Sequence, residues 1–142
     1  MTSTGSEGIL DTNTVILLTR LSDPAWLPDK PTITAVTLAE LSVGPLVAST
    51  LTERAARQAH LQQAESDFDA LPFDQAAARA FGRVASDLRA AGRKTSARAY
   101  DALIAAIAIA NGLPLYTTNP DDYTGIDELD LIPVPHPDQL ES

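Results

Sequence analysis

The feature that most constrains the fold of this 142-residue chain is an alternation of short apolar and β-branched runs with longer helical segments. Such runs, bounded by turn residues, are typical of buried strands. The expected strands share this character and lie at residues 8–11, 32–36, 68–73, 113–117 and 129–134. Because neighbouring parallel strands need a crossover helix between them, the alternation predicts an α/β fold with a mainly parallel central sheet and helices on both faces.

Capping residues indicate where several helices begin. Thr37 and Glu40 have the Thr-x-x-Glu spacing of a capping box, so Thr37 is expected to cap a helix with Glu40 in its first turn. Pro45 is expected to kink or end that helix. Ser96 is expected to cap a helix over residues 97–110. Further helices are expected at residues 15–18, 51–67 and 75–91, with a short helical turn at 119–122.

A chain of this length with 44% hydrophobic residues is expected to form one domain, over residues 8–135, between a flexible N-terminal segment at 1–7 and a C-terminal tail at 136–142. The absence of cysteine excludes a disulfide framework, a thiolate zinc site and a cysteine nucleophile. The longest apolar run, 102–110, is too short to span a membrane, and the N-terminus does not resemble a signal peptide. We therefore expect a soluble, cytoplasmic protein with no membrane partner.

Net charge argues at first against a nucleic-acid partner. The chain carries 10 basic and 19 acidic residues, a formal net charge of −9, whereas nucleic acids are themselves strongly negative. The charge is unevenly spread, because residues 75–98 hold six basic residues and one acid, while residues 99–142 hold eight acids and no Lys or Arg. Each block could be no more than a solvated helix face or an acidic tail.

Four carboxylates fall where a parallel sheet places its functional crevice, at the carboxyl ends of the strands. Asp11 ends the first strand, Glu40 follows the second, and Asp122 follows the strand at 113–117. Asp101 lies near the start of a very apolar helix, so it is expected to be partly buried. Asp11, Glu40 and Asp122 could instead serve only as helix caps or first-turn acids.

Carboxylates held close together repel one another and raise each other's pKa unless a cation neutralises them. A site with only oxygen ligands, and without cysteine or a well-placed histidine, favours Mg²⁺ or Mn²⁺ over zinc. Such a cation lowers the pKa of a bound water and stabilises charge on a phosphate during in-line attack. The acid set therefore favours hydrolysis of a phosphodiester bond.

Four segments of the chain carry motifs in a fixed order. They are 9–13 (Ile-Leu-Asp-Thr-Asn), 39–41 (Ala-Glu-Leu), 101–106 (Asp-Ala-Leu-Ile-Ala-Ala), and 113–119 (Leu-Pro-Leu-Tyr-Thr-Thr-Asn) with Asp122 and Tyr123. Each motif is weak alone, but four in order at these separations are specific. Together they resemble the signatures of PIN-domain ribonucleases, and more narrowly those of the VapC-type toxins of bacterial toxin and antitoxin pairs.

The resemblance implies a three-layer α/β/α fold and a metal-dependent endoribonuclease. It makes Asp11, Glu40 and Asp101 catalytic acids and ligands of Mg²⁺ or Mn²⁺. Members of the family commonly use a fourth acid after the strand that corresponds to 113–117. We assign that position to Asp122, with Asn119 as a polar neighbour.

The resemblance also implies supporting residues and partners. Thr12 and Asn13 are expected to hold Asp11 or a metal-bound water by hydrogen bonds. The implied substrate is RNA, often transfer or ribosomal RNA. The implied partners are a second copy of the chain in a homodimer and a VapB-type antitoxin, whose C-terminal segment would lie over the acidic groove. The candidates for binding RNA phosphates are the basic residues Arg89, Arg93, Lys94 and Arg98.

Two other interpretations stay open at this stage. An aspartyl phosphatase of the haloacid dehalogenase type also has an acid at the end of its first strand. Those enzymes need a second Asp two residues later, where this chain has Asn13. A catalytically inactive PIN-like domain kept for binding a partner chain would have the same fold without the chemistry.

Overall fold

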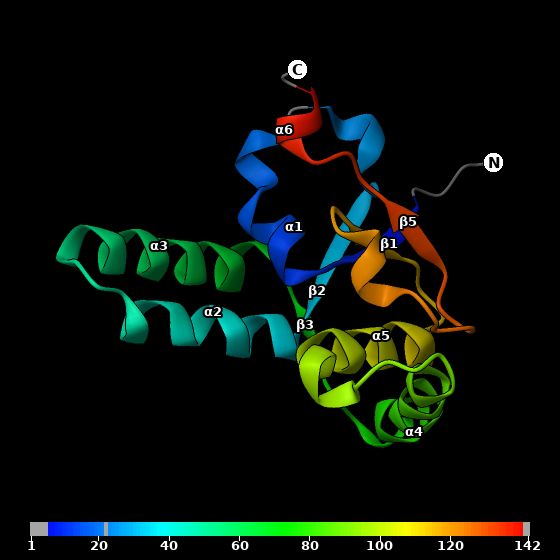
Figure 1. Ribbon diagram of the computed structural model, residues 1–142. Coiled ribbons are helices and arrows are strands. Elements are labelled where there is room, and N and C mark those ends of the chain that lie inside the picture. Colours follow the sequence, from blue (N-terminus) through cyan, green and yellow to red (C-terminus); the bar gives the residue numbers. More distant parts are fainter. Residues whose placement is uncertain (1–5, 22, 141–142) are drawn as a thin grey trace.

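The five strands expected from the sequence form one sheet in the computed structural model, which describes residues 6–21 and 23–140 (Figure 1). Hydrogen-bonded neighbours follow the order β3-β2-β1-β4-β5, and each of the four pairings is parallel. The strands are β1 (Glu7–Leu10), β2 (Lys30–Thr34), β3 (Ala70–Leu71), β4 (Leu115–Thr117) and β5 (Leu131–Pro133). This confirms the expected parallel sheet and places β1 at its centre.

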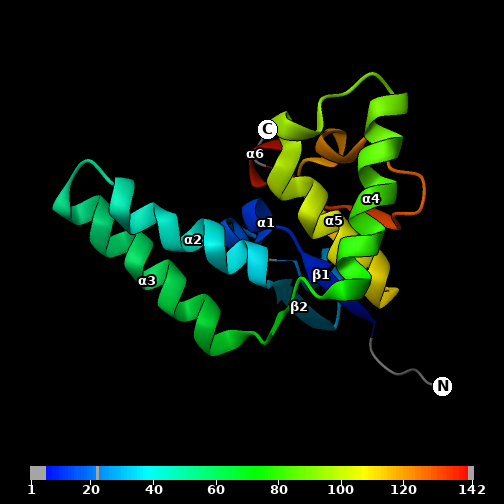
Figure 2. The same cartoon turned by 90° about the horizontal axis from the view of Figure 1, so that it is seen from below.

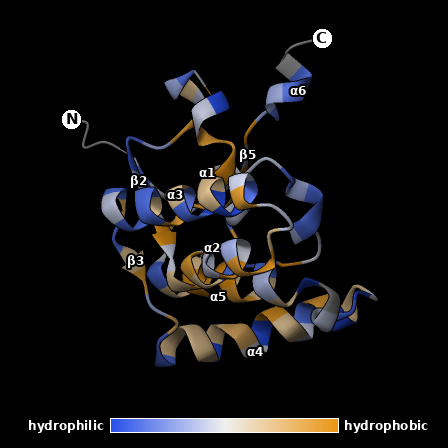
Figure 3. Cartoon of the chain, turned by 90° about the vertical axis from the view of Figure 1, so that its left-hand side faces the viewer, coloured by the Kyte–Doolittle hydropathy of each residue, from blue (hydrophilic) through white to orange (hydrophobic). Residues whose placement is uncertain are grey.

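Helices cover both faces of this sheet. They are α1 (Thr12–Ile16), α2 (Ala35–Val47), α3 (Leu51–Asp67), α4 (Gln75–Ala90), α5 (Ala99–Asn111) and α6 (Pro137–Leu140), with 3₁₀ turns η1 (Leu18–Arg20), η2 (Pro24–Trp26), η3 (Thr95–Arg98) and η4 (Pro120–Tyr123). Successive residues of β1 face opposite cores, because Ile9 packs with α4 and α5 whereas Leu10 packs with α1 and α3. Figure 3 shows the apolar strands and α5 lying between the outer helices. The expected three-layer α/β/α architecture is thus confirmed.

Helices α2 and α3 form a hairpin that extends away from the rest of the molecule (Figure 2). Thr50 caps α3 by accepting a hydrogen bond from the backbone N–H of Glu53 at 3.0 Å. Pro45 lies inside the last turn of α2, which continues to Val47 before it ends. The far end of the hairpin is apolar and exposed, since Leu46 retains 80% of its accessible surface.

The prediction that Thr37 caps α2 is wrong, because Thr34 caps this helix. The hydroxyl oxygen of Thr34 accepts the backbone N–H of Thr37 at 3.2 Å, so α2 begins three residues earlier than the capping-box spacing indicates. Glu40 therefore lies beyond the first turn, where it has no capping role. Its carboxylate is therefore free to take part in a site at the carboxyl end of the sheet.

The prediction that Ser96 caps the helix expected at residues 97–110, which is α5, is also wrong. Residues Thr95–Arg98 form the 3₁₀ turn η3, which leads directly into α5, so Ser96 is already inside helical backbone. Helix α5 begins at Ala99 without a side-chain cap, and this places Asp101 in its first turn. The helix ends at Asn111, one residue beyond the expected end, and is followed by Gly112, whose φ of +63° is left-handed and suits glycine.

Near both ends of the described chain, residues that were expected to lie outside the domain belong to regular elements. Glu7 belongs to β1, and part of the expected tail forms α6, which is tied to η1 by an ion pair between Arg20 and Asp138 at 2.6 Å. Residues 1–5 of the expected N-terminal segment and 141–142 of the expected tail lie outside the described residues. In the described part of the chain, none of the helices combines the length and the apolar character that crossing a membrane requires.

The cap assignment of α2 is testable by removing one hydroxyl. Because Thr34 is fully buried and its hydroxyl satisfies an N-terminal amide, Thr34→Val should lower the free energy of unfolding by about 1 kcal/mol. Thr52→Val, at an exposed position of α3, makes the same chemical change without removing a cap and should have a smaller effect. Urea denaturation measures both, and equal stabilities for Thr34→Val and wild type would contradict the assignment.

Candidate active site

Asp11 is both a helix cap and the most buried of the four acids, with 3% of its surface exposed. Its Oδ1 accepts hydrogen bonds from the backbone N–H of Thr14 at 3.0 Å and from the Thr14 hydroxyl at 2.6 Å. Its Oδ2 accepts from the hydroxyls of Thr117 at 2.6 Å and of Tyr123 at 3.1 Å. A buried carboxylate is tolerated when it is hydrogen-bonded in this way. Capping and a place in the site are therefore compatible roles for Asp11.

Glu40 reaches the same region from α2. The hydroxyl of Thr12 donates to its Oε1 at 2.6 Å and lies 3.0 Å from the hydroxyl of Thr37, so α1 and α2 meet through these side chains. Burial raises the pKa of Glu40; the hydrogen bond from Thr12 opposes this rise, and the charge of Asp11 adds to it. Glu40 and Asp11 thus lie close enough to influence each other.

Asp101, in the first turn of α5, links the four acids electrostatically. Its pKa is raised to about 6, first by burial and then by the charges of Asp122, Asp11 and Glu40, while Arg98 acts in the opposite direction. The carboxylates come from the ends of β1 and β4 and from the helices that follow β2 and precede β4. The structure therefore brings together the four acids that the sequence singled out.

Asp122 is held differently from the others, because its Oδ1 lies 3.0 Å from Nη1 of Arg98 in an ion pair. The neighbouring candidate, Asn119, uses its backbone N–H to donate to the Thr117 hydroxyl at 2.9 Å, and its side-chain amide lies 3.5 Å from the hydroxyl of Thr118. Asp122, and not Asn119, carries the charge that acts on Asp101.

The donor set suits a hard divalent cation in its chemistry, because four carboxylates supply only oxygen ligands and a surplus of negative charge. As arranged, however, no three Asp, Glu or His side chains among the described residues form a group that could hold a metal ion. Their oxygens are turned to other partners: Asp11 to hydroxyls, Glu40 to Thr12 and Asp122 to Arg98. Binding a cation at all four acids would require Glu40 and Asp122 to turn away from Thr12 and Arg98.

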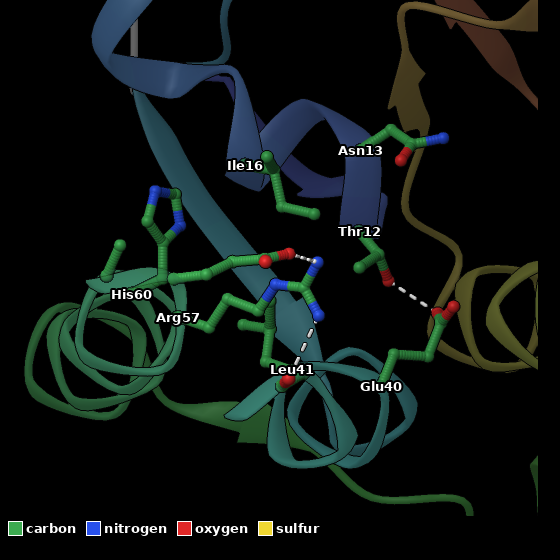
Figure 4. Close-up of a pocket in the computed structure, with 10 residues that line it drawn as sticks. Thr12, Asn13, Ile16, Glu40, Leu41, Arg57 and His60 are labelled. Atoms are coloured by element: carbon green, nitrogen blue, oxygen red, sulfur yellow. Dashed lines mark hydrogen bonds and ion pairs between the residues drawn. The ribbon is translucent and has the colours of Figure 1, made fainter. Parts of the chain in front are cut away.

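The hydrogen bonds of Thr12 and Asn13 do not go to Asp11, and their expected alternative role toward a metal-bound water stays a prediction. Thr12 donates to Glu40, and Asn13 is exposed, with its side chain directed away from Glu40 in Figure 4. Thr14 and Thr117 hold Asp11 instead. Thr14 had a local signal, since it lies three residues after a capping Asp. Thr117 had none, because its contact depends on β4 lying beside β1.

The four candidates for binding RNA phosphates divide into two pairs. Arg93 donates to the backbone carbonyls of Asp121 at 3.1 Å and Thr124 at 3.2 Å, and Arg98 pairs with Asp122, so both hold the segment around η4. Arg89, in the last turn of α4, and Lys94, just before η3, are exposed.

A cavity of about 620 Å³ adjoins the acids between α1, α2 and α3 (Figure 4). Thr12 and Glu40 form its border with the acidic site, and Ile16 and His60 lie on other walls. Arg57 of α3 pairs with Glu53 on its own helix and donates to the carbonyl of Gly44 on α2 at 3.0 Å. The cavity therefore has an acidic end and partly apolar walls.

Comparisons with known proteins agree with this fold and site. The PIN domain family matches residues 9–129. Ribonuclease VapC5 of Mycobacterium tuberculosis is 40% identical over 129 residues, 89% of this chain and 93% of that protein, and Ribonuclease VapC of Rickettsia bellii is 30% identical over 130 residues, 89% and 96% of the two chains. A crystal structure of VapBC-5 from M. tuberculosis, a member of the VapBC family of toxin-antitoxin systems, superposes with a TM-score of 0.80 at 39% identity, covering 91% of this chain and 99% of that one.

The chain therefore belongs to the PIN-domain family, the class that its fold and acid cluster indicate. Within that family it belongs to the VapC-type ribonucleases, as the sequence motifs predicted. These matches do not favour the phosphatase interpretation.

Asp101 should make the protein less stable at neutral pH than it is in acid. A carboxyl whose pKa rises from 3.8 unfolded to about 6 folded destabilises the fold when ionised, so its cost is absent below about pH 4 and complete above about pH 6. Asp101→Asn should therefore raise the free energy of unfolding at pH 7.5 by about 1 kcal/mol, the full shift being discounted for partial exposure.

Thermal or urea denaturation in EDTA, at pH 4 and at pH 7.5, measures this difference. Asp69→Asn, an exposed site of the same chemistry, is the matched control and should show no such gain. If Asp101→Asn were destabilised at pH 7.5, the raised pKa of Asp101 would be contradicted.

Proposed function

We propose that this ribonuclease cleaves RNA at the four-acid site with the help of Mg²⁺ or Mn²⁺. The observation that supports the proposal is the convergence of Asp11, Glu40 and Asp122 on Asp101, whose pKa is raised first by burial and then by the charges of these three acids. Such an accumulation of negative charge is costly for a fold unless it serves to bind a cation. We assign the reaction as hydrolysis of a phosphodiester bond by a water molecule.

Asp11, Glu40, Asp101 and Asp122 are the residues that would hold the cation. When bound, a divalent cation supplies a lowered pKa for water and charge stabilisation at the phosphate. Thr14 and Thr117 keep Asp11 fixed at the end of β1, and Thr12 orients Glu40. Arg98 pairs with Asp122 and partly offsets the negative charge of the site.

The substrate we propose is RNA, with transfer and ribosomal RNA as the classes that the family suggests. Exposed Arg89 and Lys94 would contact its phosphates, because they lie at the ends of α4 and η3 without the backbone contacts that engage Arg93. The remaining surface is strongly acidic, with a net charge of −9 for the chain. Nonspecific affinity for RNA would therefore be weaker than that of a basic protein.

We also propose that a VapB-type antitoxin silences the enzyme by covering the acids. The cavity beside Glu40 supports this, since its acidic end and its apolar wall at Ile16 and Leu41 would suit a segment with basic and apolar side chains. The relative from M. tuberculosis belongs to a family of toxin-antitoxin systems. We further propose that the enzyme forms a homodimer and acts in the cytoplasm.

The decisive experiment replaces the acids singly. Asp11→Asn and Asp101→Asn should each lower Mn²⁺-dependent cleavage of total RNA by at least about 100-fold and abolish growth inhibition, because each removes a proposed ligand. EDTA should stop the wild-type reaction. Asp69→Asn should cleave RNA like the wild type. Growth inhibition that persists in both acid variants would instead favour a catalytically inactive domain that acts by binding a partner.

The salt dependence of RNA binding tests the role of exposed Arg89 and Lys94 separately from the cleavage reaction. Arg89→Ala combined with Lys94→Ala should weaken RNA binding and reduce the slope of log affinity against log salt by about 1.4, since each phosphate contact to a single strand contributes about 0.7. The control combines Lys30→Ala with Arg54→Ala, which removes the same charge from the opposite end of the sheet and from α3. Equal slopes for the two double variants would refute the assignment.

A further inference from the structure

Tyr123 has its ring in the apolar core and its hydroxyl beside two acids of the site. It ends η4, only 2% of its surface is exposed, and its ring belongs to the apolar core beneath α4 and α5. Its hydroxyl, however, leaves that core and lies 3.1 Å from Oδ2 of Asp11 and 3.4 Å from Oδ1 of Asp101. One phenol group therefore bridges two acids that come from different elements.

The hydroxyl of Tyr123 can fix the positions of the Asp11 and Asp101 carboxylates relative to each other. A hydroxyl has one proton to donate, so it stabilises one carboxylate at a time while its oxygen remains against the other. Because the ring is locked in a packed core, the position of the oxygen is fixed by contacts that have nothing to do with the site. The carboxylates of Asp11 and Asp101 thus both lie against one oxygen atom whose position is fixed.

The arrangement also leaves a carboxylate oxygen open. Asp101 meets Tyr123 through Oδ1, and its Oδ2 receives no hydrogen bond from the described residues. The hydroxyl therefore orients the carboxylate of Asp101 without using both of its oxygens. A side chain held in this way loses less freedom when it takes up a ligand.

We propose that Tyr123 is a positioning residue that presets the separation and orientation of Asp11 and Asp101 for a divalent cation. This inference rests on the proposed function, because it concerns the same acid site. It predicts that the hydroxyl of Tyr123 sets the affinity for the cation, while its ring sets the stability of the core. Partners that orient metal ligands are commonly worth about 10 to 100-fold in metal affinity.

The test is Tyr123→Phe, which deletes the hydroxyl and keeps the ring. Isothermal titration with Mn²⁺ should give a dissociation constant about 10-fold higher than that of the wild type. The melting temperature in EDTA should stay close to the wild-type value, because Thr14 and Thr117 still donate to the two oxygens of Asp11. Tyr116→Phe is the matched control, since Tyr116 is also a buried tyrosine but packs in the core on the other face of the sheet. It should bind Mn²⁺ like the wild type.

Cleavage of RNA separates a positioning role from a catalytic one. The Mn²⁺ concentration for half-maximal cleavage should rise in Tyr123→Phe, and the rate at saturating Mn²⁺ should return to near the wild-type value. Unchanged Mn²⁺ affinity would overturn the inference. So would weaker affinity together with an equivalent loss of folded stability, or a rate that stays low at saturating Mn²⁺.

The same titrations keep this inference apart from the proposed function. If the wild type binds Mn²⁺ and Asp101→Asn does not, the acid site stands whatever Tyr123→Phe does. If the wild type itself binds no Mn²⁺, the proposed function fails and the inference about Tyr123 fails with it.

Discussion

The structure depends on how one buried carboxylate, that of Asp11, is accommodated. An ionised carboxylate this far from water costs several kcal/mol unless hydrogen bonds compensate for the lost solvation. Thr14, Thr117 and Tyr123 supply these bonds from α1, β4 and η4. Because the donors belong to segments that are distant in sequence, satisfying Asp11 also joins these segments at the carboxyl end of the sheet. The buried charge is therefore a structural junction as well as the centre of the acid site.

The distribution of charge carries more information than the net charge of −9. Burial, and after it the charges of the other acids, raise the pKa of Asp101, so ionised Asp101 carries a local electrostatic cost. Two cations of the basic stretch are directed back to the same region, where Arg98 pairs with Asp122 and Arg93 holds the carbonyls around η4. Part of the basic stretch thus builds the site, and only its exposed members remain available for a polyanion.

Sequence patterns predicted the helix bounds well where the residues that set them are close together in the sequence. Helix α3 has the predicted bounds, and α4 begins at the predicted residue, Gln75. The predictions failed where two equivalent signals competed. Thr34 and Thr37 both offer a hydroxyl near the start of α2, and the choice depends on how far β2 remains paired with β1 and β3. That pairing is not a property of the local sequence.

The sequence by itself determined the order of the elements, the parallel sheet and the four acids at its carboxyl end, because hydrophobic periodicity and chain connectivity are sufficient for these. Only the tertiary structure decided which groups hold each acid. Thr117 and Tyr123 are 106 and 112 residues away from Asp11, and they reach it because β4 lies beside β1 in a particular register. Hydrogen bonds require atoms within about 3 Å, and only the packed fold sets distances between remote residues on that scale.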